Sequence, residues 1–261
     1  APSGPVSLEL PVEVQRSPAV IMATVHAPVP TRPSAPQSAV EEMARLITQA
    51  KRPLIWLGGG ARDAVAEATE LMRRGVGVVT STNGRGVVSE EDSANLGAFN
   101  MGPDAVELYG SCDLMLVVGS RLRGNETRNN KMPLPRPLLQ IDACAGQGGR
   151  NYPVDVFAHG DAADTLRRIL DLLPEKLDTD EGLPFDIARL RAQAEGRLRE
   201  TLGHYAVVAE AISEAVSQGG NPWVRDVTIS NSTYGNRYVR LSDPKQGVHA
   251  LGGGIGQGVA M

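Results

Sequence analysis

The glycine-rich run from Gly252 to Gly258 is the stretch whose residue types most directly suggest chemistry. Glycines between a loop and a helix let a ligand approach the backbone, and free N–H groups at a helix start favour a phosphate. The structural alternative is that Ile255 is simply the first core residue of a helix. The residues of this run alone leave both interpretations open.

Thr228, Ile229 and Ser230 form a second candidate site, because they follow a predicted strand that begins at Trp223. Open α/β sheets bind ligands beyond the carboxyl ends of their strands, where hydroxyl and backbone N–H groups can hold a phosphate. A solvated loop whose hydroxyls cap the next turn would use the same residue types. Both interpretations stay open here as well.

Another glycine run, Gly58–Gly60, directly follows a short apolar stretch. A dinucleotide fingerprint of the form G-x-G-x-x-G would need a third glycine where the chain has Asp63, so this fingerprint fails. The run therefore predicts a tight turn after a buried strand.

The elements that must position these residues alternate between strand and helix. Continuous apolar runs predict strands buried on both faces at 54–57, 76–80, 114–118, 138–141 and 156–158. Helical spacing of apolar residues predicts helices over 39–50, 62–74, 104–110, 162–173, 185–202 and 205–216. This alternation indicates an α/β fold, a doubly wound, Rossmann-like parallel sheet with partial α/β segments at both ends.

Composition suggests four regions along the 261 residues. Five prolines between positions 18 and 36 predict an extended linker, and an acidic, turn-rich stretch separates the central elements from the later helices. The predicted regions are 1–37, an end segment with linker; 38–175, the doubly wound domain; 176–203, a linker with a helix; and 204–261, the start of a further domain that we expect to be truncated.

Charge and composition exclude several classes of partner. The formal net charge is -4 and basic runs are absent from the sequence, which argues against nucleic acid and anionic membranes. No stretch approaches the ~20 apolar residues of a membrane span. The two cysteines favour a reducing, cytoplasmic location over a disulfide scaffold, and the four histidines lack metal-ligand spacing.

Motifs in order along nearly the whole chain resemble the thiamine-diphosphate-dependent family of acetolactate synthase and benzoylformate decarboxylase. The stretch 4–15 looks like the closing strand of that family's pyrimidine-binding domain, and Trp223–Arg237 with Gly252–Met261 looks like the opening of its diphosphate-binding domain. The central motifs are Arg52-Pro53, Gly58-Gly59-Gly60, Thr82-Asn83-Gly84-Arg85-Gly86, Asp113-Leu114, Val118-Gly119-Ser120-Arg121, Gln140-Ile141-Asp142 and Gly160-Asp161-Ala162.

The resemblance implies thiamine diphosphate, a magnesium ion and a 2-keto acid substrate for the parent enzyme, as a homodimer or homotetramer. Matched positions imply that the Gly253 carbonyl accepts from the cofactor's aminopyrimidine and that Ile255 props the cofactor in its bent shape. Thr228, Ile229 and Ser230 would hold the diphosphate.

Some members of the family bind FAD or an adenine nucleotide in the central domain, and others leave it empty. The matching residues here are Gly59 in the turn, Arg121 for a phosphate and Asp142 for a ribose hydroxyl. A surface Arg–Asp network beside a tight turn explains the same residues, so FAD binding stays one of two alternatives.

The family's catalytic glutamate and its Gly-Asp-Gly…Asn metal motif have no match among these residues. Gly160-Asp161-Ala162 departs from that motif at its third position. We therefore assign no catalytic and no metal-binding residue, and expect a fragment of a 2-keto-acid lyase or carboligase that is inactive alone. The alternatives are a standalone FAD- or ADP-binding module and a purely structural domain.

Overall fold

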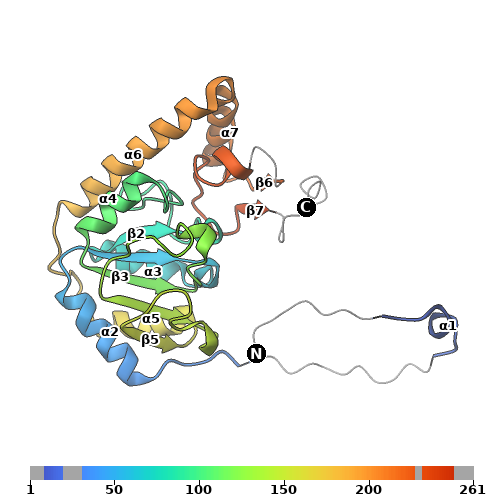
Figure 1. The fold of residues 1–261 in the computed structure, drawn as a ribbon, viewed down its shortest axis with the longest axis horizontal. Helices are drawn as coiled ribbons and strands as arrows, with labels where there is room; N and C mark the ends of the chain where they lie inside the picture. The colour runs from blue at the N-terminus through green and yellow to red at the C-terminus, as the bar shows by residue number, and fades with distance from the viewer. Residues whose placement is uncertain (1–8, 20–30, 227–230, 250–261) are drawn as a thin grey trace. The chain divides into compact units, whose positions relative to one another are not determined.

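The computed structural model describes residues 9–19, 31–226 and 231–249 (Figure 1). The chain divides into two compact units, Ala1–Arg32 and Pro33–Met261. In the first, the described helix is α1 (Val12–Gln15), in which the Gln15 N–H donates to the Pro11 carbonyl. The expected closing strand over 4–15 is therefore wrong in its described part, because Pro11 starts a helical turn there.

Five parallel strands form the central sheet of the second unit (Figure 1). They are β1 (Pro53–Leu57), β2 (Gly77–Thr80), β3 (Leu114–Val118), β4 (Leu138–Asp142) and β5 (Val156–His159). Their order in the sheet is β2-β1-β3-β4-β5, so the direction of winding reverses between β1 and β3. Such a reversal leaves a crevice between the loops that follow the two strands.

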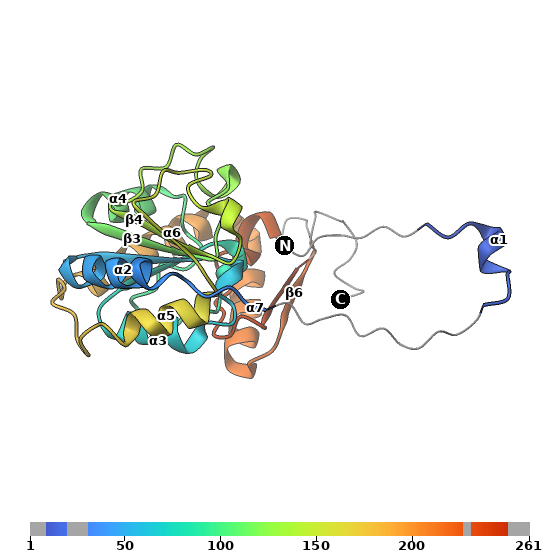
Figure 2. The same cartoon turned by 90° about the horizontal axis from the view of Figure 1, so that it is seen from below.

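Alternate residues of the strands point to opposite faces of the sheet and belong to two separate hydrophobic cores. In β1, Ile55 and Leu57 join the core under α2 (Gln37–Gln49), α3 (Val65–Arg73) and α5 (Ala162–Leu170). Leu54 and Trp56 point the other way, toward α4 (Pro103–Ser111) and α6 (Leu183–Leu202). Figure 2 shows α3 and α5 on one side of the sheet and α4 on the other. The doubly wound fold predicted from the sequence is thus confirmed.

The predicted central strands match the observed ones to within one residue at either end. Helix α6 begins earlier than predicted, and its Leu183, Ile187 and Leu190 are buried in the same core as Trp56. The strand predicted from Trp223 is observed as β6 over Trp223–Arg225, and residues 227–230 lie outside the described residues.

Beyond α6, the chain forms α7 (Ala206–Gly219) and a small parallel pair of strands, β6 (Trp223–Arg225) and β7 (Gly247–His249). A π-helical turn, Asn231–Gly235, lies between them in sequence. A third core joins these parts, with buried Ala209, Val239 and Leu241 among its members. The sequence did not predict β7, whose three residues are too short to show a pattern.

Among the residues that the structure describes, we find no helix long and apolar enough to cross a membrane.

Leu116, at the middle of β3, tests the packing of the sheet. It is 1% exposed, so Leu116→Ala should lower the free energy of unfolding by about 2–5 kcal/mol through lost burial and the cavity left behind. Val207→Ala, at a side chain that is 71% exposed, should change it by less than about 0.5 kcal/mol. Urea unfolding followed by circular dichroism measures both; equal effects would contradict the described core.

Candidate functional site

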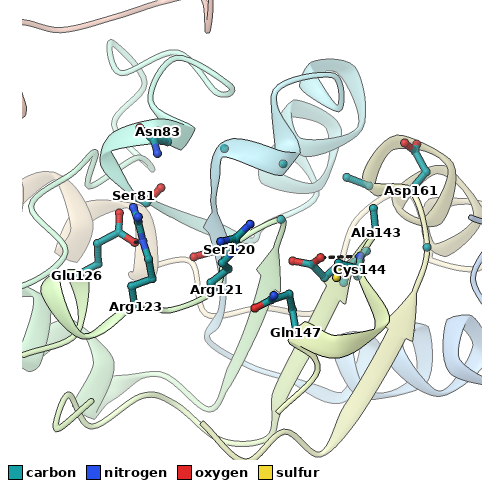
Figure 3. Close-up of a pocket in the computed structure, with 17 residues that line it drawn as sticks. Ser81, Asn83, Ser120, Arg121, Arg123, Glu126, Ala143, Cys144, Gln147 and Asp161 are labelled. Carbon is teal, nitrogen blue, oxygen red and sulfur yellow. Dashed lines mark hydrogen bonds and ion pairs between the residues drawn. The ribbon is translucent and has the colours of Figure 1, made fainter. Parts of the chain in front are cut away.

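A cavity of about 400 Å³ opens at the carboxyl ends of the central strands (Figure 3). Its walls come from the turns after β1, β2, β3, β4 and β5, which include the crevice expected at the reversal of winding. In Figure 3, Ser81 and Asn83 line one side, Ser120 and Arg121 the middle, and Cys144 the opposite side. The volume falls within the range of about 300–1,000 Å³ that is usual for small-molecule sites.

Two glycine turns form the floor of this cavity by direct backbone contact. The Gly58 N–H donates to the Val118 carbonyl at 2.8 Å, and the Gly60 N–H donates to the Gly119 carbonyl at 3.0 Å. A Cβ on Gly60 would lie 2.9 Å from the Gly119 Cα, so a side chain there would force the turns apart. Gly119 itself has a φ of +59°, in the left-handed region that glycine adopts most easily.

Asp142 is the acidic group at the end of β4. Its Oδ1 accepts the Cys144 N–H at 2.8 Å, which holds the carboxylate at the cavity wall. Burial raises the pKa of Asp142 from its ordinary value, against the opposing effects of that hydrogen bond, Arg121 and His159. A half-buried carboxylate of this kind can accept from a ligand hydroxyl.

Arg121 follows β3 and lines the same cavity, within electrostatic range of Asp142. Its own backbone carbonyl accepts from the Asn151 amide at 2.6 Å, which anchors the loop that carries it. Arg123 and Glu126 add a second pair of opposite charges, 3.9 Å apart. Burial raises the pKa of Glu126, and Arg123 opposes this shift.

Gln140 joins the two loops that carry Arg121 and Asp142. Its side chain is buried in β4, donates to the Ser120 carbonyl at 3.3 Å and accepts the Gly149 N–H at 3.1 Å. Both ends of the amide are therefore used to hold backbone, so Gln140 shapes the cavity without lining it.

Helix α5 begins at the cavity, but its first turn already has an anion. The Asp161 carboxylate accepts the Asp164 N–H at 3.1 Å, as an N-cap does. This carboxylate satisfies one of the helix's free N–H groups and brings negative charge to the helix end. A ligand phosphate in the cavity would therefore rely on Arg121 and the glycine turns.

The structure brings together three of the predicted site residues, Gly59, Arg121 and Asp142, which all line the cavity. The other five, Thr228, Ile229, Ser230, Gly253 and Ile255, lie outside the described residues.

Sequence reasoning did not assign several lining residues to a site, namely Ser81, Asn83, Arg123, Glu126, Cys144 and Gln147. Ser81 and Asn83 directly follow β2, so the rule that strand ends bind ligands could have found them. Glu126 and Gln147 end short 3-10 helices, Gly124–Glu126 and Ala145–Gln147, and Arg123 directly precedes the first of them, so the sequence carries no such signal for these three residues. Within the described ranges, His, Cys, Asp and Glu form no group of three or more that could hold a metal ion.

Comparison with known families decides what this domain is. Residues 40–169 match the family described as thiamine pyrophosphate enzyme, central domain. The chain has the central domain of the thiamine pyrophosphate enzymes. The match covers all five strands of the sheet and nearly all of α5, so the thiamine-diphosphate family expected from the sequence motifs is confirmed.

Curated relatives extend this likeness beyond the central domain. The probable 2-ketoarginine decarboxylase AruI of Pseudomonas aeruginosa is 25% identical over 258 residues, 98% of this chain and 46% of the relative. The acetolactate synthase large subunit of Parasynechococcus marenigrum is 29% identical over 65% of this chain and 29% of its own length. The acetolactate synthase large subunit of Corynebacterium glutamicum is 30% identical over 64% of this chain and 28% of its own length. The chain thus spans less than half the length of these relatives.

In this thiamine pyrophosphate enzyme central domain, the turn after β1 lies so close to the turn after β3 that position 58 has no room for a side chain. Gly58→Ala tests this close approach. Gly58 has a φ of -100°, open to any residue, but a Cβ there would lie 2.6 Å from the Ser120 Cβ and closer still to the Gly119 carbonyl oxygen. The substitution should destabilise the domain by about 1–3 kcal/mol.

Gly196→Ala in α6 is the matched control, because a Cβ there meets nothing within 4 Å. It should stabilise the helix by about 0.5–1 kcal/mol. Thermal unfolding measures both variants. If Gly58→Ala were as stable as Gly196→Ala, the close approach of the two turns would be wrong.

Proposed function

We propose that this chain supplies the central domain and its flanking segments to a thiamine-diphosphate-dependent enzyme that cleaves or joins 2-keto acids. The observation that carries the proposal is the match of 98% of the chain to the probable 2-ketoarginine decarboxylase, across the central domain and past both its ends. Similarity to acetolactate synthase large subunits supports the same substrate class.

In this proposal the four predicted regions, 1–37, 38–175, 176–203 and 204–261, keep the roles that the resemblance implies. Thr228, Ile229 and Ser230 would hold the diphosphate, Gly253 would accept from the aminopyrimidine and Ile255 would set the cofactor's bent shape. When bound, thiamine diphosphate supplies the electron sink that 2-keto-acid cleavage needs. The chain's own residues would bind and orient it.

We also propose that residues beyond these 261 supply the catalytic glutamate and the Gly-Asp-Gly…Asn segment for magnesium. The isolated chain would then be inactive. In this proposal the active protein is a homodimer or homotetramer, as the resemblance implies. We also propose a cytoplasmic location, with which the two free cysteines are compatible.

Turnover by the complete protein tests this function. Release of CO₂ from 2-ketoarginine, pyruvate or benzoylformate should require thiamine diphosphate and Mg²⁺. Ile255→Ala should lower kcat by about 10²-fold, since small misplacements of reacting groups cost that much, and Ile255→Leu should restore most of it. Val207→Ala is the control and should be unchanged. A full-length protein that binds thiamine diphosphate but converts no 2-keto acid would refute the proposed reaction.

The cavity favours a second candidate function, binding of ADP or FAD in the central domain. The glycine turns let a ligand approach the backbone, Arg121 can pair with a phosphate, and Asp142 can accept from a ribose hydroxyl. The cavity's volume of about 400 Å³ lies within the range that is usual for small-molecule sites, which supports this proposal. A central domain that serves structure alone is the competing proposal.

Calorimetric titration with ADP and with FAD tests this second function. Arg121→Met should weaken binding by about 10- to 100-fold, because a charged hydrogen bond is lost. Arg150→Met, at an exposed arginine, is the control and should leave the affinity unchanged. Burial raises the pKa of Asp142, so its carboxylate is protonated at a higher pH than usual, and affinity should fall as the pH is lowered through this raised pKa. Asp142→Asn should flatten that dependence. If neither ADP nor FAD bound, this second function would be refuted.

A further inference from the structure

The central domain holds a buried ion pair within the Thr82–Gly86 motif and the loop after it. Arg85 and Glu90 have side chains that are 2% and 1% exposed. The guanidinium meets the carboxylate through two bonds, Nε to Oε1 at 2.8 Å and Nη2 to Oε2 at 2.6 Å. A buried pair persists only when its remaining donors and acceptors are also satisfied, so their partners matter.

Those partners are backbone groups of the C-terminal segment 231–249. Arg85 donates through Nη1 to the Gly235 carbonyl at 2.8 Å and through Nη2 to the Val239 carbonyl. The Leu241 N–H donates to Glu90 Oε2 at 2.9 Å, and the Glu90 N–H donates to the Leu241 carbonyl at 2.8 Å. Four bonds therefore join one short loop of the central domain to three residues of the segment.

The loop itself is held from the other side by α6. Arg191, whose side chain is 5% exposed, donates to the carbonyls of Glu90 and Asn95. Gly86 has a φ of +78° and lies against the Asp243 backbone, where a side chain would not fit. Hydrogen bonds from α6 on one side and backbone contact with the segment on the other therefore fix the position of this loop.

We propose that Arg85 and Glu90 are a positioning pair that sets the place of segment 231–249 for the cofactor-binding stretches on either side of it. This inference rests on the proposed function, since the stretches are Thr228–Ser230 and Gly252–Gly258. The pair binds main-chain groups, so it specifies where the backbone runs whatever side chains the segment carries. Hydrophobic residues of similar volume often serve stability equally well, but they could not make these directed bonds.

Hydrogen exchange of the 261-residue chain tests the pair. In Arg85→Lys, a compact ammonium with three donors replaces the planar guanidinium and cannot serve four separate acceptors. Amides of 234–246 should exchange about tenfold faster or more, because their local opening costs less. Amides of β1, β3 and β4 should keep the wild-type rate.

Arg74→Lys is the matched control. Arg74 also pairs with one glutamate, Glu70, and donates to backbone carbonyls, those of Leu170, Leu173 and Pro174. Its substitution should loosen 170–177 and leave 234–246 unchanged. Glu90→Gln serves as a second variant should Arg85→Lys fail to fold: it keeps the shape, removes the charge and should loosen the same 234–246 amides.

Equal exchange of 234–246 in Arg85→Lys, Glu90→Gln and wild type would overturn the inference, as would uniform loosening of the whole sheet. Thiamine diphosphate with Mg²⁺, titrated into the complete protein, gives the second readout. Its affinity should weaken in Arg85→Lys and hold in Arg74→Lys, and an unchanged affinity in Arg85→Lys would also overturn the inference. If the wild-type protein binds no thiamine diphosphate, the proposed function fails, while the exchange result still decides whether the pair positions the segment.

Discussion

The close contact between the turns that follow β1 and β3 is the constraint on which the site depends. Two backbone hydrogen bonds, from Gly58 to Val118 and from Gly60 to Gly119, continue the parallel ladder past the last strand residues. Because a side chain at Gly58 or Gly60 would clash with the other turn, the two turns meet through backbone atoms alone. Both turns line the cavity, and Arg121 and Asp142 reach it because their strands end at the same edge of the sheet.

The second organising feature is the use of arginine ion pairs to hold segments that are distant in sequence. Arg52, directly before β1, pairs with Asp180 just before α6 and with Asp186 within it. Arg85 and Glu90 do the same for the segment after β6. In both cases the cation is an arginine, because its planar guanidinium can donate to several acceptors at once, which the ammonium of a lysine cannot do in the same geometry. The apolar cores hold the layers together, and these charged groups specify where the connecting segments run.

The sequence was sufficient for the central fold because each strand, such as 114–118, is a continuous apolar run bounded by turns. It also indicated that Gly59, Arg121 and Asp142 share one edge. It could not reveal the Arg85–Glu90 pair, since two opposite charges five residues apart are common on solvated surfaces. Nor did it show that α6 belongs to the core, because many charged residues mask its apolar stripe. Tertiary packing decides both.

Protection from hydrogen exchange on adding thiamine diphosphate and Mg²⁺ to the complete protein tests the central claim most directly. The claim is that the cofactor contacts lie in the C-terminal stretches and that the central-domain cavity is a separate site. We predict protection at 228–230 and 252–258, with 119–123 and 142–147 unchanged. Protection confined to the cavity loops, with none in the C-terminal stretches, would contradict this account.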